Sequence, residues 1–215
     1  MFQKSAHQVA PENTCNVREE PMQKSPKISA INPKYVPVQY QQQQQKKWTP
    51  LPFKNYVGTQ FNVSPTSKFF VIKSYTLLDV NASFINNIWA STELGNKRLS
   101  SAFKKAADDQ GEVYLFFSVN GSGKFCGVAK MTSDLDMEKS SNIWFETSKW
   151  KGVFDVDWLM VKDIPNKYFH FLKVAANENK PVSNSRDTQE IPLNIALEML
   201  KIFSTFKTST SFLMC

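Results

Sequence analysis

Residues 113–119, VYLFFSV, most constrain the fold of this chain, because they are apolar almost throughout. A strand with one face in water alternates apolar and polar residues, whereas a strand covered on both faces reads as a continuous apolar run. The stretch therefore predicts a central strand with protein packed on both faces. With 41% hydrophobic and 13% aromatic residues, the chain can build such a core.

Three further strands are predicted from segments rich in β-branched and aromatic residues: KFFVIKSY at 68–75, FCGVAKMT at 125–132 and VFDVDWLMVK at 153–162. In the last segment, apolar side chains alternate with aspartates, as in a strand with one face toward a core. This alternation places Trp158 in the core.

Two helices are predicted from apolar residues at helical spacing, one around residues 99–106 and one around 193–203, where Pro192 suits the first turn. Because the predicted strands are neighbours in the sequence, they favour a curled sheet over regular βαβ winding. The expected fold class is mixed α/β, with a small curled sheet or barrel of about six strands flanked by helices.

Residues 1–62 differ in composition from the rest, with seven prolines and a glutamine run at 41–45. Such a segment cannot bury enough apolar surface to offset the entropy lost on ordering, so we expect a disordered tail that ends in contacts of Trp48 and Phe53. The glutamine run is either an association element or a neutral spacer. One folded domain is expected over residues 63–212.

The formal net charge of +7 favours a polyanionic partner. However, residues 1–65 contain eight Lys and Arg against three Asp and Glu, so most of the excess lies outside the predicted domain. Any basic surface on the domain must therefore come from a few placed residues.

The chain has neither a secretory N-terminus nor a run of about 20 apolar residues, so no membrane association is expected. Its three cysteines, Cys15, Cys126 and Cys215, are odd in number and scattered, which fits a reducing compartment better than a disulfide scaffold. An intracellular protein is predicted.

Residues suited to catalysis are scarce, since the only histidines are His7 in the tail and His170 in YFHFLKV, an apolar, strand-like run that favours a structural role. No Cys or His pair has the spacing of a zinc site. GSGK at 121–124 lacks the longer loop and helix of a phosphate-binding motif, and Asn120, Gly121 and Gly123 are typical of a hairpin turn with positive φ angles. We therefore expect no enzyme, cofactor or metal.

Trp144 and Trp150 lie in SSNIWFETSKWKG, a polar segment without strand or helix periodicity. Two indoles in a loop either cap the core or face a ligand, and the residues alone leave both possibilities open. Lys149 and Lys151 flank Trp150, and basic residues interleaved with aromatic ones suit a single-stranded nucleic acid.

Five blocks of sequence, in order, resemble the YTH domain family: KSYTLLDV, NIWASTELGNKRLSSAF, VYLFFSVNGSGKFCGVAKM, WKGVFDVDWLMVKDIPN and NENKPVSNSRDTQEIP. The resemblance spans about residues 66–210 and is greatest to the cytoplasmic branch of the family. YTH domains are small β-barrels ringed by helices that hold a flipped-out N6-methyladenine in an aromatic cage. The resemblance implies the same fold and ligand here.

By this resemblance, the cage consists of Trp89, Trp144 and Trp150. Without it, Trp89 follows a helix-like apolar stripe and also fits a core position. Trp144 and Trp150 are six positions apart, one more than in vertebrate members of the cytoplasmic branch. The loop that carries them therefore has its own geometry here, and Phe145 is an alternative wall.

The resemblance also implies contacts around the base by Lys73, Ser74, Tyr75, Asp79, Ala90 and Asn120, and contacts at the phosphates by Lys73, Arg98, Lys151, Arg186 and Asp187. The Ala90 carbonyl would accept the remaining N6 hydrogen, Asn120 would reach the ring N3, and Asp79 would face N1. Without the resemblance, Asp79 reads as a helix-surface carboxylate and the basic residues as ordinary solvated surface.

These residue types match the chemistry of the modified base. Methylation leaves N6 one hydrogen to donate and adds an apolar carbon, so a reader must accept one hydrogen bond and bury one methyl group. Burying the methyl contributes roughly 0.8 kcal/mol, and base stacking roughly 1 to 3 kcal/mol. Stacking supplies affinity, while the methyl contacts supply about tenfold discrimination.

The expected function is a cytoplasmic reader of N6-methyladenosine in single-stranded mRNA, with a nuclear presence left open. The domain would be monomeric, and the tail would link methylated messages to decay or translation factors. One alternative is a methylation-independent single-stranded RNA-binding protein whose tryptophans only stack. An RNA-processing enzyme is disfavoured, because the chain lacks a plausible base, nucleophile or metal set.

Overall fold

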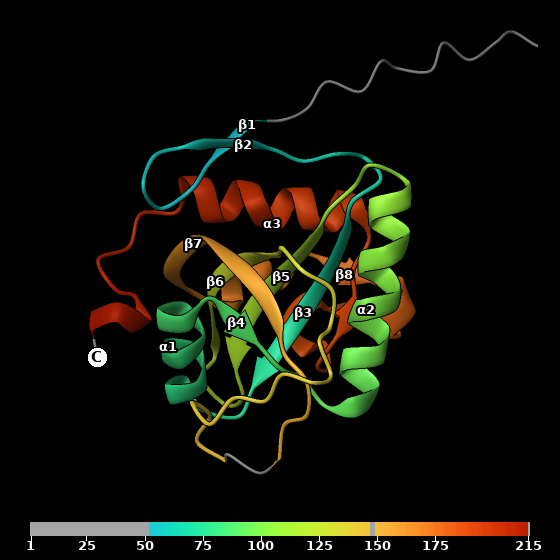
Figure 1. The fold of residues 1–215 in the computed structure, drawn as a ribbon. Helices are drawn as coiled ribbons and strands as arrows, with labels where there is room; N and C mark the ends of the chain where they lie inside the picture. Colours follow the sequence, from blue (N-terminus) through green and yellow to red (C-terminus); the bar gives the residue numbers. More distant parts are fainter. Residues whose placement is uncertain (1–51, 147–148, 215) are drawn as a thin grey trace, which may run out of the picture. The chain divides into compact units, whose positions relative to one another are not determined.

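A six-stranded sheet forms the centre of the domain in the computed structural model, which describes residues 52–146 and 149–214 (Figure 1). In spatial order the strands are β10 (Gln189–Glu190), β3 (Lys68–Ser74), β5 (Val113–Val119), β6 (Lys124–Met131), β7 (Phe154–Pro165) and β4 (Ile88–Trp89). Neighbours are antiparallel except β3 and β5, which are parallel because two helices and β4 lie between them in the chain. The mixed α/β class and the six-stranded curled sheet are as predicted.

β5 is buried on both faces, as its apolar sequence predicts. Tyr114 and Phe116 belong to one core cluster, whereas Leu115 and Phe117 belong to a second cluster on the opposite face. All four side chains are fully buried. The sheet therefore separates two cores, which are called here the first and the second core cluster.

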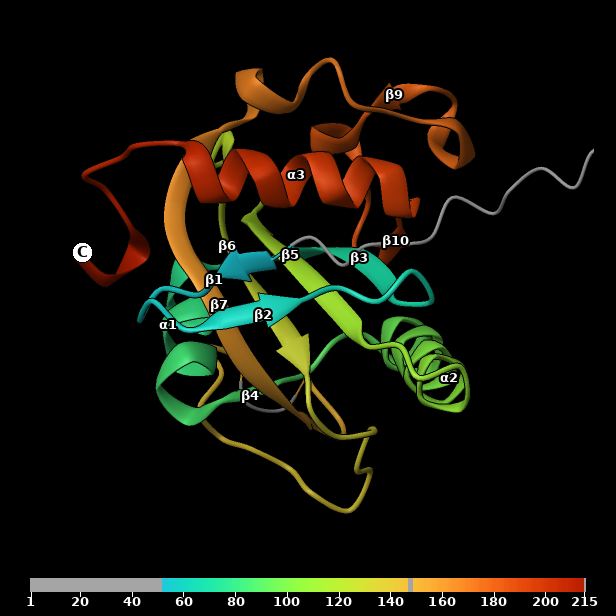
Figure 2. The same cartoon turned by 90° about the horizontal axis from the view of Figure 1, so that it is seen from above.

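Three α-helices cover the sheet: α1 (Leu77–Asn86), α2 (Glu93–Asp108) and α3 (Leu193–Thr205). α3 buries its apolar stripe in the first core cluster, whereas Val80 of α1 and Leu99 of α2 lie in the second. Figure 2 shows α3 on one side of the sheet, with α1 and α2 toward the other. Both predicted helices are thus present, and Pro192 caps α3 one residue before its first turn.

The remaining elements are short. They are the strand pairs β1 (Pro52–Lys54) with β2 (Gln60–Asn62) and β8 (Lys173–Val174) with β9 (Lys180–Pro181), and the 3-10 helices η1 (Asn166–Phe169), η2 (Ala175–Asn177), η3 (Val182–Asn184) and η4 (Phe212–Met214). Among the described residues, no helix has the length and apolarity that a bilayer crossing requires.

Trp158 of β7 is a core residue, as its alternation with aspartates predicts. It is 2% exposed, and its ring lies 4.5 Å from that of Phe117. Gly127 on the neighbouring strand makes room for this indole, because a Cβ there would lie 2.7 Å from a Trp158 ring carbon and from the Met160 carbonyl oxygen. Packing at this density tolerates no added methyl group without a shift of the neighbours.

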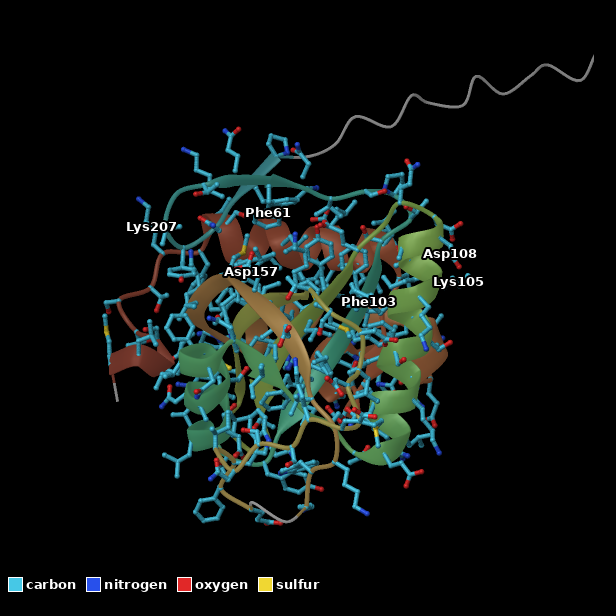
Figure 3. All side chains as sticks on the ribbon, in the orientation of Figure 1. Phe61, Phe103, Lys105, Asp108, Asp157 and Lys207 are labelled. Carbon is cyan, nitrogen blue, oxygen red and sulfur yellow. The ribbon has the colours of Figure 1, made fainter. Side chains whose placement is uncertain are left out.

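The hairpin of β1 and β2 lies in the segment that the sequence assigns to the tail. Phe61 is labelled in Figure 3. Its ring centroid lies 5.7 Å from that of Phe53, which is 5% exposed, and 6.3 Å from that of Tyr114. The packed region therefore begins before residue 63, with at least Pro52. Residues 1–51, including Trp48 and the glutamine run, lie outside the described residues.

YFHFLKV, residues 168–174, forms a strand only at its last two residues, Lys173 and Val174 of β8, so the prediction holds for that end alone. η1 ends within it at Phe169 and a turn follows, because only Phe169, Leu172 and Val174 find places in the first core cluster. His170 is exposed. The turn predicted before β6 is present, with positive φ at Gly121 (75°) and Gly123 (69°) but not at Asn120.

Candidate functional site

A cavity of about 330 Å³ lies between the end of β3, the first turn of α1, and β4 with the loop that follows it. The β5–β6 turn, the loop before β7 and residues 185–187 complete its walls. Its walls are Lys73, Ser74, Tyr75, Asp79, Trp89, Ala90, Ser91, Thr92, Asn120, Trp144, Trp150, Ser185, Arg186 and Asp187. All three predicted cage tryptophans and all six residues predicted around the base are in this set. Arg98 and Lys151 are not.

Trp89 and Trp144 form two walls that are also part of the core. They are 5% and 3% exposed, and their rings meet edge to face, with centroids 5.5 Å apart and planes at 79°. Trp89 pairs with Phe154 of β7, and its ring contacts Phe117 at 5.0 Å. The core and ligand alternatives for these tryptophans are therefore compatible, because each indole belongs to the second core cluster and lines the cavity.

Trp150 forms a third wall and is only partly buried. Its ring lies 5.8 Å from that of Tyr75, and the Lys149 ammonium lies 4.1 Å from the Tyr75 ring and 5.2 Å from the Trp150 ring. Phe145, the alternative wall, is 65% exposed and does not line the cavity. Of Trp144 and Phe145, the two candidates for the wall on the same loop, only Trp144 lines the cavity.

Two polar groups at the cavity wall belong to Ala90 and Asn120. The carbonyl of Ala90, directly after Trp89, accepts no hydrogen bond from the described residues. The Asn120 main-chain N–H donates to the Ser74 carbonyl at 3.0 Å, which holds the β5–β6 turn against the end of β3. This arrangement leaves an acceptor and an amide side chain at the wall for a polar, planar ligand.

Asp79 is a buried carboxylate in the first turn of α1, 5% exposed, and not the helix-surface residue that its sequence alone suggests. Its Oδ2 accepts from the Thr76 hydroxyl at 2.7 Å, and its Oδ1 accepts the main-chain N–H of Phe145 at 2.8 Å. A side chain predicted to face the base therefore also holds the loop that carries Trp144.

Lys73 lines the cavity but directs its ammonium elsewhere. Residues 69 and 71 of β3 face the first core cluster, and the Lys73 side chain follows them to that face, away from the tryptophans. There its Nζ donates to the Ser118 hydroxyl at 3.2 Å and to the Ser183 carbonyl at 3.1 Å. Burial lowers the pKa of this lysine. The phosphate contact of this ammonium stays a prediction, and in the structure both of its hydrogen bonds go to protein groups.

Asp187 joins three segments at the rim of the cavity. Its Oδ1 accepts the Lys73 main-chain N–H at 2.9 Å, and its Oδ2 accepts the Ser91 hydroxyl at 2.9 Å. Burial raises the pKa of this carboxyl, and the hydrogen bonds only partly offset the effect. Since its oxygens are occupied and negatively charged, Asp187 organises the site and is not itself a suitable contact for a phosphate.

The remaining predicted phosphate residues converge only in part. Arg186 is exposed and lines the cavity. Arg98 is exposed on α2 and donates through one Nη1 to the Thr188 carbonyl and hydroxyl oxygens, at 3.0 and 2.9 Å. Lys151 is exposed and does not line the cavity. The structure therefore places one exposed guanidinium, that of Arg186, at the cavity.

Three lining residues are not predicted from the sequence: Ser91, Thr92 and Ser185. Ser91 and Ser185 each adjoin a predicted residue and Thr92 does not, but a serine or threonine in a loop carries no signal of its own. Gly95 allows the first of them to approach, because a Cβ there would clash with the Ser91 hydroxyl and lie 3.0 Å from the Thr188 methyl group. The loop after β4 therefore packs directly on the first turn of α2.

The fold and the cavity define a small α/β domain with one pocket lined by three tryptophans among the described residues. A family model described as YTH, the YT521-B-like domain, matches residues 67–204. The chain is 49% identical over 158 residues to YTH domain-containing family protein 2 of Danio rerio, a match that covers 73% of this chain and 25% of that protein. It is 51% identical over 146 residues to YTH domain-containing family protein 1 of Mus musculus, covering 68% and 26%.

Two solved structures are also similar. The Pho92 YTH domain, crystallised in complex with m6A, has a TM-score of 0.69 and 44% identity, over 76% of this chain and 99% of that one. The YTH domain of Zygosaccharomyces rouxii MRB1, in complex with N6-methyladenosine RNA, has a TM-score of 0.65 and 46% identity, over 71% and 95%. This chain belongs to the YTH domain family. Its matched region spans about a quarter of the length of the curated relatives.

Proposed function

We propose that this domain is a reader of N6-methyladenosine in single-stranded RNA and that it binds the base without converting it. The observation that carries the proposal is the cavity of about 330 Å³ walled by Trp89, Trp144 and Trp150. It is supported by the two similar YTH domains, which were solved with m6A and with N6-methyladenosine RNA.

The geometry of the cavity suits one methylated adenine. Two perpendicular indoles and a third at the opening provide apolar faces for the ring and the methyl group. The Ala90 carbonyl is available for the remaining N6 hydrogen, and the Asn120 side chain for an acceptor on the ring. Unmethylated adenine would stack on the same walls but would leave one N6 hydrogen facing indole carbon, which opposes its binding.

The phosphate contacts belong to Arg186 first, since its guanidinium is exposed beside the cavity. Arg98 and Lys151 lie farther along the surface and would reach flanking nucleotides. Lys73 and Asp187 would support the site and not hold a phosphate directly, because both side chains bond to neighbouring protein groups. Affinity should accordingly decrease with salt, with a modest slope.

At the level of the whole protein, we propose that the reader links methylated mRNA to decay or translation factors through residues 1–62. A cytoplasmic location and a monomeric domain are part of the same proposal. These assignments rest on the family and not on the cavity. Pull-down of decay and translation factors with and without residues 1–51 would test the link.

Paired titrations test the reader proposal. Two oligonucleotides that differ only in one N6 methyl group are titrated calorimetrically into the full chain. We expect about tenfold tighter binding of the methylated strand. Methyl burial contributes roughly 0.8 kcal/mol, and the N6 hydrogen that unmethylated adenine leaves without an acceptor raises the difference to about 1.4 kcal/mol, which is tenfold. Equal affinities would contradict the proposal and favour a methylation-independent single-strand binder. Release of altered RNA in a turnover assay would instead indicate an enzyme.

A further inference from the structure

Asn96, on α2, is a buried polar residue that links two cage segments. It is 2% exposed and does not line the cavity. Its Oδ1 accepts the main-chain N–H of Ser91 at 2.9 Å, and its Nδ2 donates to the main-chain carbonyl of Lys151 at 2.9 Å. Both ends of one amide group are therefore bonded to main chain from different segments.

The two bonded segments each carry a cage tryptophan. Ser91 follows Trp89 by two residues, and Lys151 directly follows Trp150. The two tryptophans are far apart in the sequence, so their relative position depends on contacts of this kind. A carboxamide is suited to the task, because it offers a donor and an acceptor on one rigid plane.

Asp79 plays the corresponding part for the third wall. Its Oδ1 accepts the N–H of Phe145, the residue directly after Trp144, and Thr76 supports its other oxygen. Each tryptophan is thus followed, within two residues, by a main-chain group bonded to a buried side chain of α1 or α2. Side chains of α1 and α2 therefore fix the main chain next to each cage tryptophan.

We propose that Asn96 is a positioning residue that sets the separation of Trp89 and Trp150 and thereby the preference for the methylated base. The inference rests on the proposed function of the same site. It assigns no contact with RNA to Asn96, because the amide is enclosed and both of its polar ends are bonded to protein.

The substitution Asn96→Asp in the full chain tests this role. The introduced carboxylate still accepts the Ser91 N–H, but it has no hydrogen for the Lys151 carbonyl and places two oxygens against each other. We expect the affinity for the methylated oligonucleotide to fall about tenfold or more, as for a buried charged group with a lost partner. Unmethylated RNA, which relies on stacking and phosphate contacts, should lose less, so the ratio of the two affinities should move toward one.

A pH series separates positioning from general damage. Protonation gives the carboxyl group at position 96 an O–H that can donate to the Lys151 carbonyl, as the amide does. The affinity ratio of the variant should therefore recover toward the wild-type ratio at about pH 5, relative to wild type at the same pH. A purely structural defect would lower the melting temperature and both affinities together and leave the ratio unchanged.

The matched control is Asn194→Asp, the same chemical change at an exposed position in the first turn of α3. It should leave both affinities unchanged. If Asn96→Asp does not fold at neutral pH, Asn96→Ala carries the comparison. That variant should show the lower ratio without recovery at low pH.

The outcomes distinguish this inference from the proposed function. Wild-type preference for methylated RNA together with an unchanged ratio in both Asn96 variants would overturn the positioning role alone. If wild type shows no preference, the reader proposal fails, and the indole N–H resonances of Trp89 and Trp150 decide the positioning role. They should shift in Asn96→Asp at neutral pH and return at low pH, and unshifted resonances would overturn it.

Discussion

The three tryptophans at the cavity differ in how much of the fold depends on them. Trp89 and Trp144 are 5% and 3% exposed and belong to the second core cluster. Replacing either one by alanine would remove about 3 to 5 kcal/mol of stability, so a loss of binding there would be mixed with a loss of folding. Trp150 is only partly buried and packs at the edge of the cluster. Its contribution to binding can be measured separately.

We expect Trp150→Ala to lower the affinity for methylated RNA about tenfold or more, because it removes one stacking wall worth roughly 1 to 3 kcal/mol. Its melting temperature should stay close to that of wild type. Phe145→Ala is the control, since this neighbouring aromatic residue is 65% exposed and does not line the cavity. Calorimetric titration checks both variants, and a loss of affinity in Phe145→Ala would favour Phe145 over Trp144 as the wall.

Replacing one carboxylate oxygen of Asp79 by an NH2 group tests whether this side chain faces N1 of the base. Adenine N1 and a carboxylate are both acceptors, whereas Asp79→Asn supplies a donor while its remaining oxygen can still accept the Phe145 N–H. We therefore expect tighter binding of methylated RNA by this variant, measured by calorimetry. Unchanged or weaker affinity would argue against a contact between Asp79 and N1.

At the scale of secondary structure elements, the cavity depends on connections that are short in space and long in sequence. Asp187, just before β10, bonds to the main chain of β3 and to the loop after β4. Asn96 bonds α2 to the residue after Trp150, and Asp79 bonds α1 to the residue after Trp144. Buried polar groups of this kind specify one arrangement of the elements, because each unmade bond would leave an unsatisfied group.

The raised pKa of Asp187 predicts a pH dependence of stability. Well above neutral pH the residue is ionised in both folded and unfolded chains, and burial of the charge then opposes folding. As the pH falls through the raised folded-state pKa, the folded chain takes up a proton that the unfolded chain does not, which stabilises it. This stabilisation is complete once the pH falls below the pKa of the residue in the unfolded chain, about 3.9.

Asp187→Asn should lack this contribution. The free energy of unfolding of wild type minus that of the variant should therefore increase as the pH is lowered from 7 toward 4.5. Urea denaturation at both pH values, followed by fluorescence, provides the measurement. A difference that is constant with pH, or that decreases on acidification, would show that Asp187 is not destabilised by its burial.

At the scale of the whole molecule, charge is a poor guide to the location of the site. The net charge is +7, yet most of the excess lies in residues 1–65, and of the four basic residues predicted at phosphates only Arg186 is exposed at the cavity. RNA affinity should then depend on salt through few contacts. This is the expected behaviour of a domain that recognises one base and not a long polyanion.

We expect Arg186→Ala to lower the affinity for methylated and for unmethylated RNA by similar factors. The slope of log affinity against log salt concentration should decrease in magnitude by about 0.7, the value for one phosphate of a single strand. Lys201→Ala, which removes one exposed charge from α3, should leave the slope unchanged. Titrations at several salt concentrations check this. A change confined to the methylated strand would place Arg186 at the base instead of a phosphate.

Much of the fold could be predicted from local patterns. The apolar run at 113–119, the alternation around Trp158 and the two helical stripes each lie within one element, and burial of that element is their direct physical cause. YFHFLKV is a strand only at its end, because an apolar composition does not determine which side chains reach a core. The contact of Phe53 is confirmed, but the hairpin around it has no sequence signal, because only one residue of 52–62 is buried.

For the cavity, the family resemblance predicted which residues would meet, and the fold determined what each side chain does. Sequence places Lys73 and Asp79 near the base, but the alternation of β3 turns the Lys73 ammonium to the opposite face of the sheet. The first turn of α1 encloses Asp79 under the loop of Trp144. Asn96 has no sequence signal at all, since its partners are main-chain groups of distant segments.

The sequence by itself therefore determined the class of fold and the central strand, and it predicted the three tryptophans that line the cavity, because these depend on residue type and on spacing within an element or a family block. Only the tertiary structure decided which tryptophans are both core and wall, which cation faces the cavity, and which buried amide and carboxylate hold the walls in place. Those properties depend on directions of side chains and on hydrogen bonds between segments far apart in the chain. No local pattern of residues encodes them.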